Sequence, residues 1–154
     1  RQARQPRHVE LLRCYNEISM SVTYLEHTAD ICFKIVSPTK EDLFSEAMKA
    51  LMDALKPEER EHERGNPIVI EIKSDGLSAL LIDFLNEVLS LAMIEMVVFE
   101  TLRIKELSGD TLRAEVVGYP VSGFGEEIKG VTHHEAEVKQ NEKGKWEVTI
   151  VADV

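Results

Sequence analysis

The longest apolar segment of the sequence covers residues 77–99, and it constrains the fold more than any other feature. Three acids, Asp83, Glu87 and Glu95, interrupt this segment. A bilayer penalises an acid near the centre of a span by roughly 3 kcal/mol, so we do not expect a transmembrane helix. The pattern "DGLSALLIDFLNEVLSLAMIEM" instead predicts a buried helix that begins near Ser78 and forms the centre of a protein core.

A second helix is predicted earlier in the chain. The stretch "SPTKEDLF" is typical of a helix start, with Thr39 as the N-cap and Asp42 in the capping-box position. The helix is expected to end near Pro57, and the charged residues 56–67 that follow predict a solvated surface loop. Apolar side chains recur on one face of this helix at Leu43, Phe44, Ala47, Met48, Leu51, Met52 and Leu55.

Strand patterns lie on both sides of the two helices. One pattern follows Asp30, and another covers residues 68–74. Two hairpins are predicted: "VVFETLRIKEL" with "TLRAEVVGYPV", and "IKGVTHHEAEVK" with "KWEVTIVADV". The predicted strands and helices do not alternate regularly along the chain, as they would in a fold built from βαβ units. We therefore predict one α+β domain, with a mostly antiparallel sheet and two main helices packed on one of its faces.

The last hairpin predicts which side chains share a face, because side chains alternate along a strand. The apolar residues 146, 148, 150 and 152 would face the core, so Asp153 would point away from it. Pairing the two apolar faces would place Val138 opposite Trp146 and His134 opposite Ile150. We therefore interpret His134 as a structural histidine.

The other face of the same hairpin would carry Lys129 and His133 on the side of Asp153. This arrangement predicts that Lys129 lies near Asp153. Lys129 is then either an ordinary exposed lysine or a group that faces a partner or a phosphate.

Composition limits the classes of function. The chain has 154 residues, enough for one domain, and its net charge of −10 argues against a sequence-independent grip on nucleic acid. Its two cysteines, Cys14 and Cys32, show no disulfide or zinc-site spacing, which suits a reducing, cytoplasmic environment.

Residues 1–19 differ from the rest of the sequence. They contain four arginines and two glutamates without a sustained apolar period, and they lack the apolar region of a signal peptide. We predict that they form a flexible leader that contributes little to the fold, and that residues 20–154 form the domain. The domain then carries 14 basic and 26 acidic residues, a net charge of −12.

Four motifs together resemble the archease family: "HTAD" ahead of a strand, "LLIDFLNEVL", "EIKGVTHHEAEV" and the final "ADV". The resemblance covers about residues 20–154. It departs from the family pattern at Phe84, Gly130 and His133, where Trp, Ala and Tyr are usual. The family accompanies the GTP-dependent RNA-splicing ligase, which joins RNA 3′-phosphate ends to 5′-hydroxyls.

The resemblance also implies a metal site. It assigns Asp30, Asp153 and the terminal carboxylate of Val154 to one divalent cation. Ligand sets made only of oxygen suit Ca²⁺, Mg²⁺ or Mn²⁺, and Ca²⁺ is our first expectation. From composition alone, Asp30 would be read simply as the polar residue that opens a strand. His27 is expected beside the ligands or held by a neighbouring backbone group.

Two classes of function follow. In the first, implied by the resemblance, the protein is a non-catalytic activator that helps the ligase acquire its guanylate and turn over repeatedly in tRNA splicing. It would meet RNA only through the ligase and would not bind a membrane. A general chaperone for RNA-modifying enzymes is a variant of this class. In the second, the protein is itself a metal-dependent phosphohydrolase.

Overall fold

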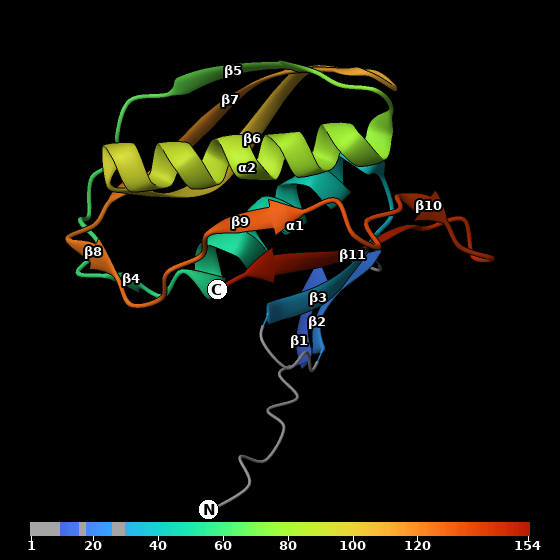
Figure 1. The fold of residues 1–154 in the computed structure, drawn as a ribbon, viewed down its shortest axis with the longest axis horizontal. Helices are drawn as coiled ribbons and strands as arrows, with labels where there is room; N and C mark the ends of the chain where they lie inside the picture. The colour runs from blue at the N-terminus through green and yellow to red at the C-terminus, as the bar shows by residue number, and fades with distance from the viewer. Residues whose placement is uncertain (1–9, 16–17, 26–29) are drawn as a thin grey trace, which may run out of the picture.

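The computed structural model describes residues 10–15, 18–25 and 30–154, in which two helices lie between two antiparallel sheets (Figure 1). The six-stranded sheet has the order β1-β2-β3-β11-β10, and β9 also pairs with β11. Its strands are β1 (Glu10–Tyr15), β2 (Ile18–Leu25), β3 (Asp30–Ser37), β9 (Gly130–Thr132), β10 (Lys139–Gln140) and β11 (Trp146–Asp153).

The remaining strands form a three-stranded sheet and a short two-stranded pair. The three-stranded sheet has β7 at its centre, between β5 and β6. Its strands are β5 (Ile68–Lys73), β6 (Val97–Leu107) and β7 (Thr111–Pro120), and the short pair is β4 (Pro57–Glu58) with β8 (Gly123–Phe124). The positions predicted for the strand of residues 68–74 and for the first hairpin are confirmed.

Helix α1 (Lys40–Ala54) begins where the sequence predicted. The main-chain N–H of Asp42 donates to Thr39 Oγ1 (3.1 Å), so Thr39 is the N-cap. Leu55 is the C-cap of the helix, and it is followed by Lys56 in the left-handed region (φ 51°). The predicted apolar stripe is fully buried against β3 and β6, which fixes α1 between the two sheets.

Helix α2 (Leu77–Glu95) is the core helix that the apolar segment predicted. Figure 1 shows it between the three-stranded sheet and β9, and it contacts both. By length and composition alone α2 is apolar enough to cross a membrane. Its apolar side chains, however, are used within the protein: Leu80, Leu81, Ile82, Phe84, Leu85, Val88, Leu89 and Ala92 are buried.

The predicted fold class is confirmed, because every strand pairing is antiparallel and helices cover one face of each main sheet. The strands form two main sheets, however, and not the single one that the sequence suggested. Strand β3 pairs with β2 and β11. The hairpin β6–β7 pairs with β5 and makes a separate sheet on the other side of the helices.

The structure differs from the sequence analysis before residue 20. Strand β1 lies inside the range assigned to the leader, and it pairs with β2 from Glu10 opposite Thr23 to Tyr15 opposite Ile18. Main-chain hydrogen bonds make this pairing, and they need no apolar period in the sequence. The part played by residues 1–19 in stability stays a prediction.

The predicted register of the last hairpin is wrong. Strand β10 pairs Gln140, and not Val138, with Trp146. Strand β9 pairs with the far end of β11, with Val131 opposite Ala152. Residues 133–138 lie between these two short ladders and belong to neither, so one continuous register cannot describe the hairpin.

A turn in this intervening segment explains the error. Ala136 N–H donates to the carbonyl oxygen of His133 (3.3 Å), and Glu135 adopts a left-handed conformation (φ 59°). His134 therefore does not lie opposite Ile150. Its side chain is 75% exposed and its Nε2 lies 3.6 Å from Glu135 Oε1, so the interpretation of His134 as a structural histidine was wrong.

Candidate functional site

Asp30 and Asp153 are direct cross-strand partners at the ends of β3 and β11. Side chains of direct partners project from the same face of a sheet, with Cβ atoms about 4.5–5.5 Å apart. Phe33 and Ile35 are buried on the face of β3 toward α1, so Asp30 projects from the opposite face. We call Asp30 and Asp153 the acid pair.

Lys129 lies next to this pair. Its main-chain N–H donates to the carbonyl oxygen of Asp153 (2.8 Å), and its side chain is exposed. The following residue, Gly130, is the direct partner of Asp153 across β9 and β11. Gly130, and not Lys129, therefore shares the strand face of Asp153, and the face predicted for Lys129 was wrong. Asp153 is exposed, as the alternation of β11 predicted, and Val154 is 40% exposed. The assignment of Val154 as a ligand stays a prediction.

Two histidines, His27 and His133, were predicted to lie beside the site. His27 lies outside the described residues. His133 is found beside α2, where its Nε2 lies 3.4 Å from Asp83 Oδ1. Asp83 also accepts a hydrogen bond from Ser74 Oγ (2.5 Å). His133 therefore contacts an acid of α2. The prediction that His133 lies on the strand face of Asp153 was wrong.

The pKa of Cys32 depends on the negative charges in this part of the sheet. Burial raises the pKa of the Cys32 thiol, and the negative charges of Glu135 and Asp30 raise it further. Cys32 is 5% exposed, and its raised pKa favours the protonated thiol. Cys32 is thus a small buried apolar residue in a negative environment, and a thiolate ligand is not expected there.

The chemistry of the acid pair suits a hard cation in part. Two carboxylates on one face of a sheet are oxygen donors of the kind that Ca²⁺ and Mg²⁺ prefer. Within residues 10–15, 18–25 and 30–154, however, no three His, Cys, Asp or Glu side chains come close enough together to hold a metal ion. The metal site therefore stays a prediction, with two of its expected ligands side by side.

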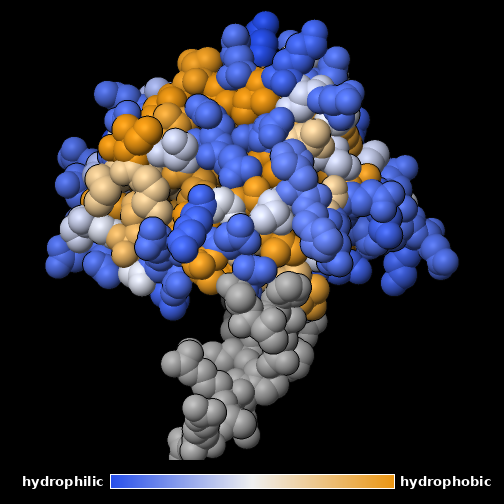
Figure 2. All heavy atoms as spheres, in the orientation of Figure 1, coloured by the Kyte–Doolittle hydropathy of each residue, from blue (hydrophilic) through white to orange (hydrophobic). Residues whose placement is uncertain are grey.

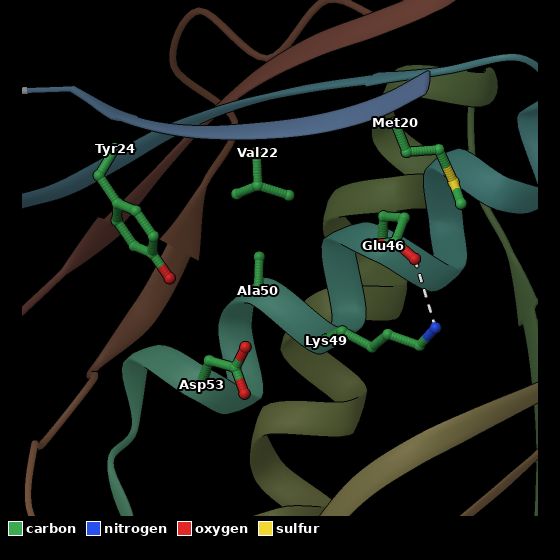
Figure 3. Close-up of a pocket in the computed structure, with 7 residues that line it drawn as sticks. All are labelled: Met20, Val22, Tyr24, Glu46, Lys49, Ala50 and Asp53. Carbon is green, nitrogen blue, oxygen red and sulfur yellow. Dashed lines mark hydrogen bonds and ion pairs between the residues drawn. The ribbon is translucent and has the colours of Figure 1, made fainter. Parts of the chain in front are cut away.

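A small cavity lies between β2 and α1 (Figure 3). Tyr24 from β2 points toward Asp53 of α1 in this cavity, and burial together with the charge of Asp53 raises the pKa of the Tyr24 phenol. One turn before Asp53 in α1, Lys49 Nζ pairs with Glu46 Oε1 at 3.3 Å. The cavity volume is about 30 Å³. This is room for about two waters, too little for a substrate.

A larger groove of about 290 Å³ lies between α1 and β6, and Arg60 and Glu100 line it. Arg60 forms an ion pair with Glu100, and its guanidinium carbon lies 3.6 Å from the centroid of the Tyr119 ring. Arg64 Nε donates to Tyr119 Oη (3.2 Å). We call Arg60, Arg64, Glu100 and Tyr119 the arginine–tyrosine cluster.

This cluster was not predicted from the sequence. Residues 56–67 are mostly exposed, as predicted for a surface loop, and they also run along the end of β7. Glu61 N–H donates to the carbonyl oxygen of Pro120 (2.9 Å), and Gly65 N–H donates to that of Gly118 (2.8 Å). The two sides of these contacts are far apart in sequence, and no local pattern announces them.

Exposed apolar side chains gather over the C-terminal end of α2 and the start of β5, at the left of Figure 2. Ile94 is 71% exposed and Val69 is 67% exposed. Neither element carries the acid pair or Lys129. This patch is therefore separate in the fold from the residues that the sequence analysis selected.

Comparison with known proteins identifies the family. The sequence model described as "Archease protein family (MTH1598/TM1083)" matches residues 23–154. The chain belongs to the archease family. It is 34% identical to the protein archease of Methanopyrus kandleri, a match that covers 84% of this chain and 96% of the relative. It is 32% identical to the archease of Methanosarcina barkeri, over 85% of this chain and 94% of the relative.

Solved structures share the archease fold. The solution structure of protein 1598 of Methanobacterium thermoautotrophicum superposes with a TM-score of 0.64 at 22% identity, over 85% of this chain and 96% of that one. A crystal structure from Thermotoga maritima, described as an archease and possible chaperone, superposes with a TM-score of 0.60 at 21% identity, over 84% and 94%. At these identities the likeness establishes the fold alone.

Proposed function

We propose that this archease is a non-catalytic accessory protein that activates the GTP-dependent RNA-splicing ligase in the cytoplasm. It promotes guanylylation of the ligase and multiple turnover in tRNA splicing or RNA repair. The acid pair carries the proposal: it joins Asp30 of the "HTAD" motif directly to Asp153 of the final "ADV" motif. Two acids that are distant in the sequence thus lie on opposed positions of neighbouring strands.

Charge supports a protein partner. Residues 20–154 have a net charge of −12, and clustered lysines and arginines are what a grip on RNA phosphates requires. The ligase therefore holds the RNA in our proposal, and this archease acts on the ligase. The description of the Thermotoga maritima archease as a possible chaperone agrees with a role exerted on another protein.

We also propose that Asp30 and Asp153 hold a divalent cation, with Ca²⁺ as the first candidate and Mg²⁺ or Mn²⁺ as alternatives that prefer the same oxygen donors. A bound cation would neutralise the two carboxylates and offer open coordination positions to phosphate oxygens. The main-chain N–H of Lys129 is bonded to the carbonyl oxygen of Asp153, and the Lys129 side chain is exposed. It would contact the partner or a phosphate of the bound nucleotide.

The test is ligase turnover with and without this archease, run beside a phosphatase assay of the archease alone. We expect one round of ligation without the archease and many rounds with it. Unchanged turnover would refute the activator. Phosphate release by the archease alone would favour a metal-dependent phosphohydrolase.

Calorimetry with Ca²⁺, Mg²⁺ and Mn²⁺ tests the cation separately. Asp153→Asn removes one charge at nearly constant shape and should weaken binding. Glu142→Gln is the matched control, because it removes one charge from an exposed acid in the β10–β11 turn. Equal affinities of the parent and Asp153→Asn would exclude Asp153 as a ligand.

A further inference from the structure

Strand β9 is only three residues long, yet it lies beside the acid pair. One of its edges pairs with β11, where Gly130 is the direct partner of Asp153. A three-residue strand with one partner is marginal by itself. Its other edge faces α2, and the contacts made there decide how firmly Lys129 and Gly130 are held against Asp153.

Asn86 of α2 makes those contacts. The main-chain N–H of Val131 donates to Asn86 Oδ1 (2.8 Å), and Asn86 Nδ2 donates to the carbonyl oxygen of Val131 (2.9 Å). The side-chain amide thus binds both polar main-chain groups of one residue, as a neighbouring strand would. The six-stranded sheet is continued at this edge by one side chain of a helix.

The orientation of this amide is fixed by a third hydrogen bond. Asn86 Nδ2 also donates to the carbonyl oxygen of Ile82 (3.2 Å), one turn earlier in α2. Both N–H groups of the amide are then used. A flipped amide would set N–H against N–H and oxygen against oxygen, so only one arrangement satisfies Val131.

We propose that Asn86 is a positioning residue of the acid-pair site, which holds β9 so that Lys129 and Gly130 stay against Asp153. Lys129 is two residues from Val131, and its N–H bonds the carbonyl oxygen of Asp153 (2.8 Å). Asn86 therefore acts through the main chain of β9. For its effect on activity, this inference rests on the proposed function; for its effect on β9, it does not.

A second residue of α2 provides a matched control. Ser78 Oγ accepts a hydrogen bond from the main-chain N–H of Val138 (3.0 Å), at the opposite end of the segment that follows β9. Both residues therefore hold the stretch from β9 to β10 against α2, Asn86 at Val131 beside the acid pair and Ser78 at Val138 beside β10. A purely structural role would make the two substitutions act alike.

The experiment compares Asn86→Ala with Ser78→Ala in the full chain, by NMR amide exchange without the ligase and then by ligase turnover. Asn86→Ala removes the oxygen that accepts from the Val131 N–H together with both N–H donors, and it adds no charge. We expect it to speed exchange at Val131 by about tenfold and to shift the amide signals of Lys129 and Asp153. Ligase activation should also fall about tenfold. Ser78→Ala should speed exchange at Val138 and leave activation within about twofold.

Unchanged exchange at Val131 with unchanged Lys129 and Asp153 signals would overturn the inference, as would an equal loss of activation in Ser78→Ala. If Asn86→Ala does not fold, Asn86→Ser, whose shorter side chain cannot bind both main-chain groups of Val131, serves for the same measurements. If the parent archease does not activate the ligase, the proposed function fails. The positioning inference is then decided by the exchange and signal measurements alone.

Discussion

The acid pair and the arginine–tyrosine cluster arrange charge in opposite ways. The acid pair puts two carboxylates on directly opposed positions of β3 and β11. The cluster pairs Arg60 with Glu100 and stacks it on the ring of Tyr119. Like charges on direct partners destabilise a sheet, whereas ion pairs and cation–π contacts stabilise a fold. The cluster thus joins opposite charges, whereas the acid pair places two like charges on opposed positions of neighbouring strands.

Two glycines show the same contrast in packing. A Cβ added to Gly118, beside Tyr119, would lie 2.0 Å from the carbonyl oxygen of Val98. A Cβ added to Gly130, beside Asp153, would meet Asn86 Oδ1 at 3.6 Å, an ordinary contact. The main chain is packed tightly near the cluster and has room near the acid pair.

Gly118→Ala should have the largest effect. The new Cβ cannot be accommodated unless the main chains of β6 and β7 separate, because Phe99 Cα would also lie at 2.7 Å. We expect the free energy of unfolding to fall by about 3 kcal/mol or more, measured by urea denaturation. Gly130→Ala is the control and should change it by less than about 0.5 kcal/mol. Equal losses in the two variants would remove the packing contrast.

The acid pair should show the reverse pattern, a large effect on function and a small one on stability. Asp30→Asn and Asp153→Asn should each lower ligase activation about tenfold or more, since each removes a proposed cation ligand. The free energy of unfolding should stay the same or rise by about 0.5 kcal/mol, because a like-charge contact is relieved. Turnover assays and thermal unfolding measure the two effects. A large loss of stability in either variant would show that the pair supports the fold.

Arg60→Gln tests the cluster in the same two assays. It removes the ion pair with Glu100 and the stack on Tyr119, both of them exposed contacts. We expect a loss of about 1 kcal/mol in the free energy of unfolding and unchanged ligase activation. Arg60→Lys keeps the charge without the planar stack and should fall between parent and Arg60→Gln. Loss of activation at constant stability would assign a function to the cluster.

The smallest expected effect is a change in the titration of one phenol. The hydrogen bond from Arg64 favours the ionised form and lowers the pKa of Tyr119, whereas burial raises the pKa of Tyr24. Tyr119 should therefore ionise at a lower pH than Tyr24 in a titration followed by ultraviolet absorbance. Arg64→Met should move the pKa of Tyr119 up, and Tyr119→Phe identifies its signal. A titration unaffected by Arg64→Met would show that the two side chains do not interact in solution.

Local patterns in the sequence were sufficient for the helices. The Thr39 cap and the apolar period placed α1, and the long apolar segment placed α2 in the core. The resemblance to the archeases selected Asp30 and Asp153, which the structure brings together. The helix predictions succeeded because they depend on neighbours along one helix. The assignment of Asp30 and Asp153 as cation ligands stays a prediction.

The errors involve contacts between distant segments. The turn at residues 133–138 changes the register of the last hairpin, and neither a proline nor a glycine in that segment signals it. Asn86 bonds a main chain 45 residues later, and Arg64 bonds a phenol 55 residues later. A polar residue on a predicted helix or loop does not reveal such a partner, because the residues next to it in the sequence do not indicate which distant segment it contacts.

The position of β11 has a consequence for synthesis of the protein. This strand comes late in the sequence but is interior to the six-stranded sheet, where it pairs with β3, β9 and β10. A ribosome releases β3 more than a hundred residues before it releases β11, so β3 must wait for its partner while the rest of the domain emerges. Until then its edge is open to mispairing. Asp30 meets Asp153 only when β11 closes this sheet, so a nascent chain that lacks β11 cannot offer the acid pair to a ligase.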